Sequence, residues 1–361
     1  MAGNVHRVGS VTGSFQSESP LHPAATEFLT DAFARGWANP QKIHHDSRNA
    51  AILLNQAKET IASYLKVQPA QLQFLADPSA GFHIGISGLL RPESKLFYPA
   101  TSRSEVFSVA RSLSEDRTKH LEVDFRGQCA DPAGTEEDVL SWQGVNGETG
   151  VISHQPADFI GRTFYDLTSA GAFWGLPEGW DVALWDARSW QGPAGLGILG
   201  VNHGALWRNP LPHMDSAAPI SDFSIPLAIA SAIALEAHVQ DYDRERSRLL
   251  ALNQRIRNFL TEQISDVDIA GNLHESLPHL LSFSFLYVDA EQLVQSLERQ
   301  GFSVDSGSAC TSSNMEHSHV LAAMGLLTHG NVRITLKPDV KEESIDAFLV
   351  TLKKTVEELR D

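Results

Sequence analysis

One of the two cysteines in the chain, Cys310, lies in a run of small and hydroxylated residues at 306–313. Such a run predicts a loop, so the thiol is expected to be reachable rather than packed in the core. A reachable thiol that loses its proton becomes a nucleophile or a metal ligand. Taken alone, however, the loop favours a turn with a buried, inert cysteine, and sulfur chemistry is predicted only when the flanking segments are considered with it. Cys129 has no comparable setting.

The elements that must position this loop are predicted from apolar spacing. Residues 22–67 read as helices, and from about residue 72 to 200 short apolar runs alternate with helical ones. This alternation predicts an α/β domain with a mainly parallel sheet. The strand candidates lie at residues 71–75, 95–98, 120–123, 150–153, 163–166, 182–185 and 197–201.

A second, smaller unit is predicted in the C-terminal part of the chain. The patterns favour a long helix over 226–264, a strand over 280–287, a helix and short strand over 293–304, and an amphipathic helix over 342–360. Prolines that cluster near 210–225 mark a boundary. The predicted division is an N-terminal arm (1–20), a large α/β domain (21–220), a linking long helix (221–265) and a small α+β domain with the cysteine loop (266–361).

Composition disfavours several classes of protein. The chain of 361 residues has a net charge of −16 and a pI near 5.3, which argues against nucleic acid and anionic membranes as partners. No apolar run approaches the ~20 residues that span a bilayer, and the polar N-terminus lacks the apolar core of a signal peptide. The chain has no Cys-x-x-Cys pair of the kind that would indicate a structural zinc site. With so few cysteines, a cytoplasmic protein is predicted.

Three segments together resemble the cysteine desulfurases of the class V aminotransferase family. Residues 277–285 are similar to the strand entering the small domain, 306–313 to the persulfide-forming loop, and 331–336 to the strand with the substrate-binding arginine. The resemblance implies a fold-type-I architecture dependent on pyridoxal phosphate (PLP), with a large sheet domain and a small C-terminal α+β domain, and a homodimer. It also implies that Cys310 attacks the sulfur of cysteine and that Arg333 binds its carboxylate, a task that suits a planar guanidinium.

The lysine that holds PLP in this family is missing. The family places it just before a Gly-Pro-x-Gly turn, and registering on Gly192 and Pro193 puts Ser189 at its position. Serine cannot form a Schiff base. A shifted register does not help, because the chain has no lysine between Lys119 and Lys337.

Other positions around the cofactor ring are altered as well. Asp166 corresponds to the aspartate that holds the pyridinium nitrogen, although it could equally be kept for structure by capping a helix. Ser169 stands where a glutamine contacts the 3′-oxygen, and Gln155 stands for a substrate-site asparagine. Val106 takes the place of the stacking histidine and would cover the ring without aromatic stacking.

The phosphate positions implied by the resemblance are mixed in charge. Ser79, at a strand-to-helix turn, Arg188 and Ser224 would contact the phosphate, helped by a helix N-terminus. Asp77 and Asp186 place carboxylates beside it, which is repulsive, although Arg188 could offset the charge of Asp186. Pro78 removes one N–H donor.

Two functions compete, and Ser189 favours the first. In the first, the protein is a degenerate desulfurase, a pseudoenzyme that keeps Cys310 and Arg333 to receive persulfide, to bind a sulfur acceptor or iron–sulfur scaffold protein, or to hold an iron–sulfur ligand. In the second, it is an active PLP-dependent cysteine desulfurase that releases the sulfur of cysteine as persulfide. Weaker alternatives are PLP bound without a covalent link, and a structural dimer partner for an active paralogue.

Histidine and tryptophan clusters carry two interpretations each. His44 and His45 could bind metal or serve structure. His317 and His319 could lower the pKa of the Cys310 thiol or simply decorate a loop. The tryptophans near the lysine position either fill a shrunken cofactor pocket or pack in an ordinary core; they are Trp174, Trp180, Trp185 and Trp190.

Overall fold

The computed structural model describes residues 13–17, 20–35, 37–154, 156–212, 222–307 and 317–361. Cys310 and Gln155 lie outside these residues. Among the described residues, no helix is long and apolar enough to cross a membrane.

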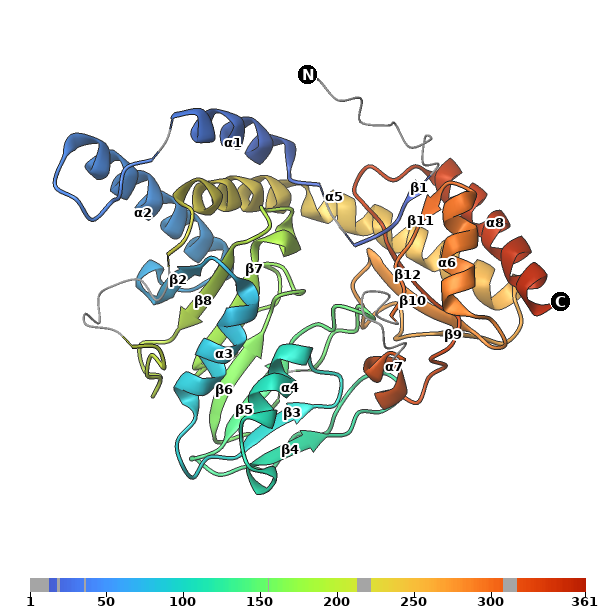
Figure 1. Ribbon diagram of the computed structural model, residues 1–361, viewed down its shortest axis with the longest axis horizontal. Coiled ribbons are helices and arrows are strands. Elements are labelled where there is room, and N and C mark those ends of the chain that lie inside the picture. Colours follow the sequence, from blue (N-terminus) through green and yellow to red (C-terminus); the bar gives the residue numbers. More distant parts are fainter. Residues whose placement is uncertain (1–12, 18–19, 36, 155, 213–221, 308–316) are drawn as a thin grey trace, which may run out of the picture.

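A seven-stranded sheet forms the centre of the larger part of the molecule (Figure 1). Its order is β2-β8-β7-β6-β5-β3-β4, and β4, β3, β5, β6 and β7 pair in parallel. β8 is antiparallel to both of its neighbours, β2 and β7. The predicted α/β class with a mainly parallel sheet is therefore confirmed. The strands are β2 Leu72–Leu75, β3 Leu96–Pro99, β4 Thr118–Leu121, β5 Val139–Gln143, β6 Arg162–Asp166, β7 Val182–Asp186 and β8 Gly197–Val201.

Helices cover both faces of this sheet, so its central strands are buried on both sides. α1 (Pro23–Arg35) and α2 (His45–Leu65) each pack against α5 (Ile225–Gln263), whose first half lies on one face of the sheet. α3 (Pro78–Leu89) and α4 (Ser104–Arg111) cover the other. α3 packs closely because a Cβ on Gly81 would lie 2.5 Å from the Leu184 side chain. Short 3-10 helices occupy Pro69–Gln71 (η1), Glu115–Arg117 (η2) and Ala187–Trp190 (η3).

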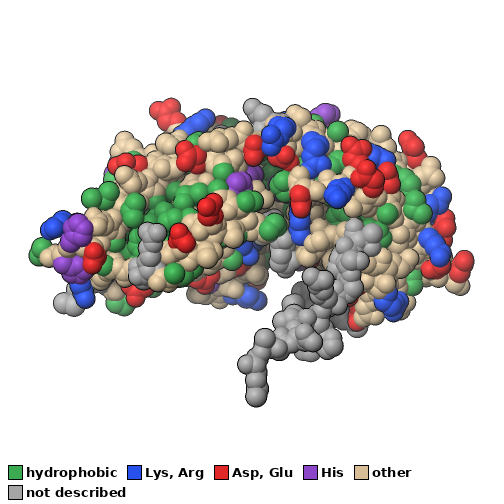
Figure 2. All heavy atoms as spheres, turned by 90° about the horizontal axis from the view of Figure 1, so that it is seen from above, with side chains coloured by type: hydrophobic (Ala, Val, Ile, Leu, Met, Phe, Trp, Pro, Cys, Tyr) green, Lys and Arg blue, Asp and Glu red, His purple; other side chains and the backbone are tan. Residues whose placement is uncertain are grey.

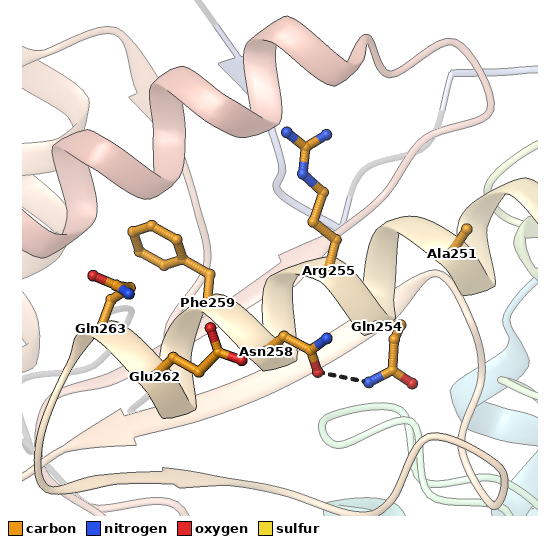
Figure 3. Close-up of a pocket in the computed structure, with 7 residues that line it drawn as sticks. All are labelled: Ala251, Gln254, Arg255, Asn258, Phe259, Glu262 and Gln263. Carbon is orange, nitrogen blue, oxygen red and sulfur yellow. Dashed lines mark hydrogen bonds between the residues drawn. The ribbon is translucent and has the colours of Figure 1, made fainter.

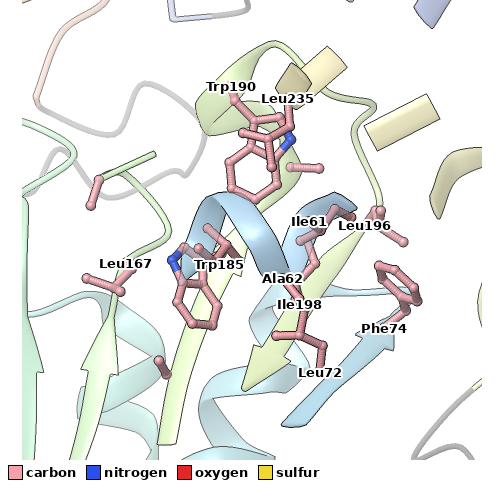
Figure 4. Close-up of a cluster of buried hydrophobic side chains, with 14 of the residues drawn as sticks. Ile61, Ala62, Leu72, Phe74, Leu167, Trp185, Trp190, Leu196, Ile198 and Leu235 are labelled. Carbon is pink, nitrogen blue, oxygen red and sulfur yellow. The ribbon is translucent and has the colours of Figure 1, made fainter. Parts of the chain in front are cut away.

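Alternate residues of the central strands enter two different hydrophobic clusters, as the period of a strand requires. Tyr165 and Trp185 belong to the cluster with α2 and α5, whereas Phe164 and Leu184 belong to the cluster with α3 and α4. Figure 4 shows Trp185 and Trp190 within the first cluster, among side chains from strands and helices. These two tryptophans are therefore core residues, while Trp174 and Trp180 are only partly buried against the same cluster.

The C-terminal part has its own sheet and core. β9 (Val267–Ile269), β10 (Leu280–Phe285) and β12 (Asn331–Thr335) form a three-stranded antiparallel sheet. The N-terminal strand β1 (Gly13–Ser14) pairs with β11 (Phe302–Ser303), and Phe15 packs in this core together with the second half of α5. The remaining helices are α6 Ala290–Arg299, α7 His319–Ala323 and α8 Glu342–Arg360.

Most of the predicted elements are confirmed, and one strand assignment fails. The helix expected over 226–264 is α5 and that over 342–360 is α8. The strands β1, β5 and β9 are not among the predicted ones. The strand expected over 150–153 is wrong: Val151 and Ile152 form only isolated bridges, because Gly150 has a φ of +76° and turns the chain. The domain boundaries remain a prediction.

Candidate functional site

The residues predicted to surround a cofactor ring lie at the carboxyl ends of the parallel strands. Asp166 is the last residue of β6 and Asp186 the last residue of β7. Arg103 follows β3 and directly precedes α4, and the loop around Asn146 follows β5. Ligand sites of α/β sheets lie at this edge, because the connecting loops meet there.

Asp166 is held by hydrogen bonds from its own turn. Its side chain is 2% exposed. Oδ1 accepts from the backbone N–H of Thr168 at 3.0 Å and from the Thr168 hydroxyl at 2.6 Å, while Oδ2 accepts from Gln143 Nε2 at 3.4 Å. The sequence left open that Asp166 has a structural role as a helix cap. In the structure its carboxylate caps a turn and not a helix.

Arg103, which sequence reasoning did not single out, lies between the two predicted ring contacts. Its Nε is 3.5 Å from Asp166 Oδ2, and its Nη2 donates to Ser169 Oγ at 2.7 Å. The backbone of Gly147 closes the other side, where a Cβ would lie 2.6 Å from Ser169 Oγ and 3.0 Å from Arg103 Nη2. A guanidinium therefore occupies the space between the carboxylate and the hydroxyl.

The side chain of Asn146 holds the loop after β5 through hydrogen bonds. Its Nδ2 donates to Thr101 O at 3.0 Å and to Gln143 Oε1 at 2.9 Å. Its Oδ1 accepts from the backbone N–H groups of Glu148 and Thr149 at 3.0 and 2.9 Å. Because Gln143 in turn donates to Asp166, one polar network joins the ends of β3, β5 and β6.

The segment with the lysine position is the short helix η3. Asp186 Oδ2 accepts hydrogen bonds from Arg188 Nε and Nη2 at 2.9 and 2.6 Å. The positive charge of Arg188 therefore offsets the negative charge of Asp186, as expected. Ser189 is half-buried, and its Oγ donates to the carbonyl of Asp186 at 2.7 Å. Trp190 anchors the segment in the core, where its Nε1 donates to Ser231 Oγ at 3.2 Å.

The N-terminus of α3, predicted to hold the phosphate, is occupied by carboxylates of the chain. Asp77 accepts from Ser79 N at 2.9 Å, and the Ser79 hydroxyl donates to Glu105 Oε1 at 3.0 Å. Burial alone would raise the pKa of Glu105, but hydrogen bonds from its own backbone, Ser79 and Ser104 and the nearby Arg103 charge lower it below its usual range. Glu105 is therefore an anion at neutral pH.

Arg333 faces carboxylates on the other side of the site. Its Nη2 is 3.4 Å from Asp305 Oδ2, and its backbone forms a two-bond bridge with Asp305. Burial raises the pKa of Glu148, against a hydrogen bond from Ser318 and the charges of Arg333 and His319. A Cβ on Gly307 would lie 2.3 Å from Glu148 Oε1. The Glu148 carboxyl group therefore lies against the backbone of Gly307, at the start of the cysteine loop.

Other predicted residues make structural contacts. His44 caps α2 by accepting from Ser47 N, and His319 bonds the carbonyl of Ser102 at 2.9 Å. Val106 is 1% exposed in the core and presents no free surface to a ring. Ser224 precedes α5 without a side-chain cap bond. Within the described ranges, no cluster of three or more His, Cys, Asp or Glu suits a metal ion.

A surface hollow on α5 is separate from these residues (Figure 3). It is lined by one face of the helix, and Gln254 donates to Asn258 there at 2.8 Å. None of the residues predicted for the site lines this hollow. The residues that line it are Ala251, Gln254, Arg255, Asn258, Phe259, Glu262 and Gln263.

The chain is similar in sequence to known cysteine desulfurases. Residues 224–348 match the family Aminotransferase class-V. The chain is 27% identical to the cysteine desulfurase IscS of Dictyoglomus turgidum, over 96% of this chain and 94% of that protein. It is 26% identical to cysteine desulfurase 2 of Trichormus variabilis, over 96% and 92%.

Solved structures share the fold. One called NifS-like protein has a TM-score of 0.84 at 21% identity, over 96% of this chain and 99% of that one. A NifS-like protein from Rickettsia africae has a TM-score of 0.81 at 17% identity, over 95% and 99%. The fold is thus the fold-type-I architecture predicted from the sequence. Residues 224–348 are thus similar to the class V aminotransferases, and the chain as a whole is similar to cysteine desulfurases.

PLP is the cofactor that this relationship implies, and the described residues do not fit it. The chain offers no lysine between Lys119 and Lys337. The partner expected for a ring nitrogen, Asp166, already faces Arg103, and the expected phosphate contact, Ser79, already faces Glu105. No catalytic step through PLP follows from this arrangement.

Proposed function

We propose that this protein is a degenerate relative of the cysteine desulfurases that performs no lysine-dependent PLP catalysis and handles sulfur through Cys310. The absence of any lysine between Lys119 and Lys337 carries the proposal. Without a lysine there is no amine to hold the cofactor or to move protons on it. Arg333 would still attract a carboxylate-bearing ligand or partner.

The sulfur step proposed for Cys310 needs no cofactor. Its thiolate attacks the outer sulfur of a donor persulfide, the S–S bond of the donor breaks, and the donor leaves as a thiolate. The sulfur then passes to an acceptor by the same exchange, so no oxidant is required. An acceptor protein for sulfur or iron–sulfur assembly is the partner that this step implies.

An active desulfurase is the alternative, and the names of the relatives support it, since cysteine desulfurases match nearly the whole chain. The two functions separate in one experiment on purified protein with added PLP and cysteine. We expect the spectrum of a protein-free mixture of PLP and cysteine, and no sulfide above that control. Sulfide release with multiple turnovers would contradict the proposal.

A second arm of the same experiment tests Cys310 with a small persulfide donor such as glutathione persulfide. We expect one reducible sulfur on the wild type, none on Cys310→Ser, and one on the control Cys129→Ser. Cys129 should not react, because burial and then the Asp131 charge raise the pKa of its thiol to about 12. Sulfur loading that persists in Cys310→Ser would exclude the proposed role.

A homodimer is the assembly that we propose for this chain. Large apolar side chains are exposed on α1, on α2 and in the connection between them, and Figure 2 shows hydrophobic side chains gathered on that side of the molecule. Such a patch is costly in water and is typical of an interface. The exposed residues are Phe33, Ile43, Ile52 and Leu53.

Light scattering should therefore give the mass of two chains, and the paired substitution Ile52→Lys with Leu53→Lys should give the mass of one. A charge buried in the interface without a partner would oppose association. Val350→Lys, another exposed apolar position, on α8, serves as the control and should leave the dimer intact. A single-chain mass for the wild type would disprove this assembly.

A further inference from the structure

The side chain of Arg103 contacts Asp166 and Ser169, the two residues that were expected to contact a cofactor ring. It is the first flanking residue of α4, and its side chain is 34% exposed. Instead of extending into solvent, it turns inward to Asp166 Oδ2 at 3.5 Å and to Ser169 Oγ at 2.7 Å. Both partners are more than sixty residues away in sequence, so the contact is a feature of the tertiary fold.

The carboxylate of Asp166 needs a positive charge because it is almost fully buried. Arg103 provides that charge, and Thr168 and Gln143 supply the hydrogen bonds. Both oxygens are then engaged, so a second cation, such as a protonated ring nitrogen, would have to displace Arg103. Gly147 borders the pair on one side, where a Cβ would lie 2.6 Å from Ser169 Oγ and 3.0 Å from Arg103 Nη2, so the backbone lies close against the guanidinium.

The other end of the site repels an anion. Asp77 and Glu105 already accept the hydrogen bonds of Ser79 at the N-terminus of α3, and Pro78 contributes no N–H. Asp186 adds a third carboxylate, with Arg188 as its own partner. A phosphate would meet fixed negative charges where a helix N-terminus would otherwise attract it.

We propose that Arg103 is an internal stand-in for the cofactor ring and that, with Asp77 and Glu105, it closes this site to PLP in every binding mode, non-covalent binding included. The inference goes beyond the proposed function, which excludes only lysine-dependent catalysis. The site is then a structural centre that joins the ends of β3, β5 and β6.

The first test is binding of pyridoxine 5′-phosphate, which lacks the aldehyde and therefore does not react with surface lysines. Equilibrium dialysis with the wild-type chain should show no saturable binding at millimolar ligand. Saturable binding of one molecule per chain would overturn the inference. It would leave the proposed function intact, because a bound ring without a lysine still gives no lysine-dependent turnover.

The second test asks whether Arg103 acts as the cation of Asp166. Arg103→Ala should lower Tm by about 5 °C, because it leaves a buried carboxylate without its cation. Arg111→Ala, on the exposed side of the same helix, is the matched control and should change Tm little. Asp166→Asn in the Arg103→Ala background should recover part of the loss, since the amide carries no charge to neutralise.

Millimolar N-ethylguanidinium gives a further readout that a general packing defect would not show. It should raise the Tm of Arg103→Ala by refilling the space beside Asp166, and it should not raise the Tm of Arg111→Ala. An unchanged Tm in Arg103→Ala, or strictly additive effects of the Arg103 and Asp166 substitutions, would refute the ion pair on which the inference depends.

Discussion

Trp190→Ala is expected to destabilise the protein by about 4 kcal/mol, because it removes a large, fully buried side chain and leaves a cavity in the main core. The loss should be visible as a shift of the denaturant midpoint at unchanged slope. Trp190 is also the last residue of η3, so its packing against α5 fixes the segment in which the family keeps its lysine.

Two related substitutions divide this effect into its parts. Trp190→Phe keeps most of the apolar area and should cost less than half as much. Ser231→Ala keeps the ring but removes the acceptor of the indole N–H, which should cost about 1–2 kcal/mol. Trp174→Ala is the control for a tryptophan that is only partly buried against the same cluster, and it should cost clearly less than Trp190→Ala. Equal losses at Trp174 and Trp190 would contradict the assignment of Trp190 to the core.

The sequence was sufficient for the elements whose signal is local. The sequence predicts α5 because its residues are rich in Ala and Leu and then in Arg and Glu, and α8 because its pattern is amphipathic. Most strands are predicted because short apolar runs alternate with helical ones. β5 was missed because Ser141 and Gln143, which are polar, are buried in it. The failure at 150–153 has the opposite cause, since Val151 and Ile152 are β-branched but follow a glycine that turns the chain.

The candidate site was predicted only as far as single positions allow. The segments identify five single positions: Asp166, Ser169, Ser79, Asp186 and Arg188. The pairing of Arg188 with Asp186 is also predictable, because the two residues are only two positions apart in the sequence. The partners of the first three residues were not foreseen. Arg103 and Glu105 reach them across long sequence separations, which no local pattern reveals. One signal was available: the polar residues that follow the buried run of β5, Asn146 and Glu148 among them, indicate a network at the end of a strand.

Ser189→Lys alone is expected to leave the protein without covalently bound PLP. The new lysine would lie on η3, whose Ser189 now donates to the carbonyl of Asp186. Arg103 would still be paired with Asp166 and Ser169, so the carboxylate expected for the ring nitrogen would stay occupied. Asp77 and Val106 would also remain, so neither the phosphate nor the ring face would gain a contact.

The measurement is reduction with borohydride after addition of PLP, followed by peptide mass spectrometry at residue 189. Ser63→Lys is a matched control, because Ser63 is exposed and its hydroxyl also donates to the carbonyl three residues earlier. We expect no more labelling at residue 189 than at residue 63. Stoichiometric labelling at residue 189 would mean that a PLP ring can enter the site and that Arg103 yields to it.

The double variant Ser189→Lys with Arg103→Ala then identifies which barrier matters most. If Arg103 is the principal obstacle, removing it should raise labelling at residue 189 above the Ser63→Lys level, because the carboxylate of Asp166 would be free to pair with a ring nitrogen. If the carboxylates at the α3 N-terminus dominate instead, labelling should rise only when Glu105→Gln is added, because this change removes the anion that Ser79 now holds. In both cases the order in which substitutions restore labelling ranks the obstacles by their electrostatic cost.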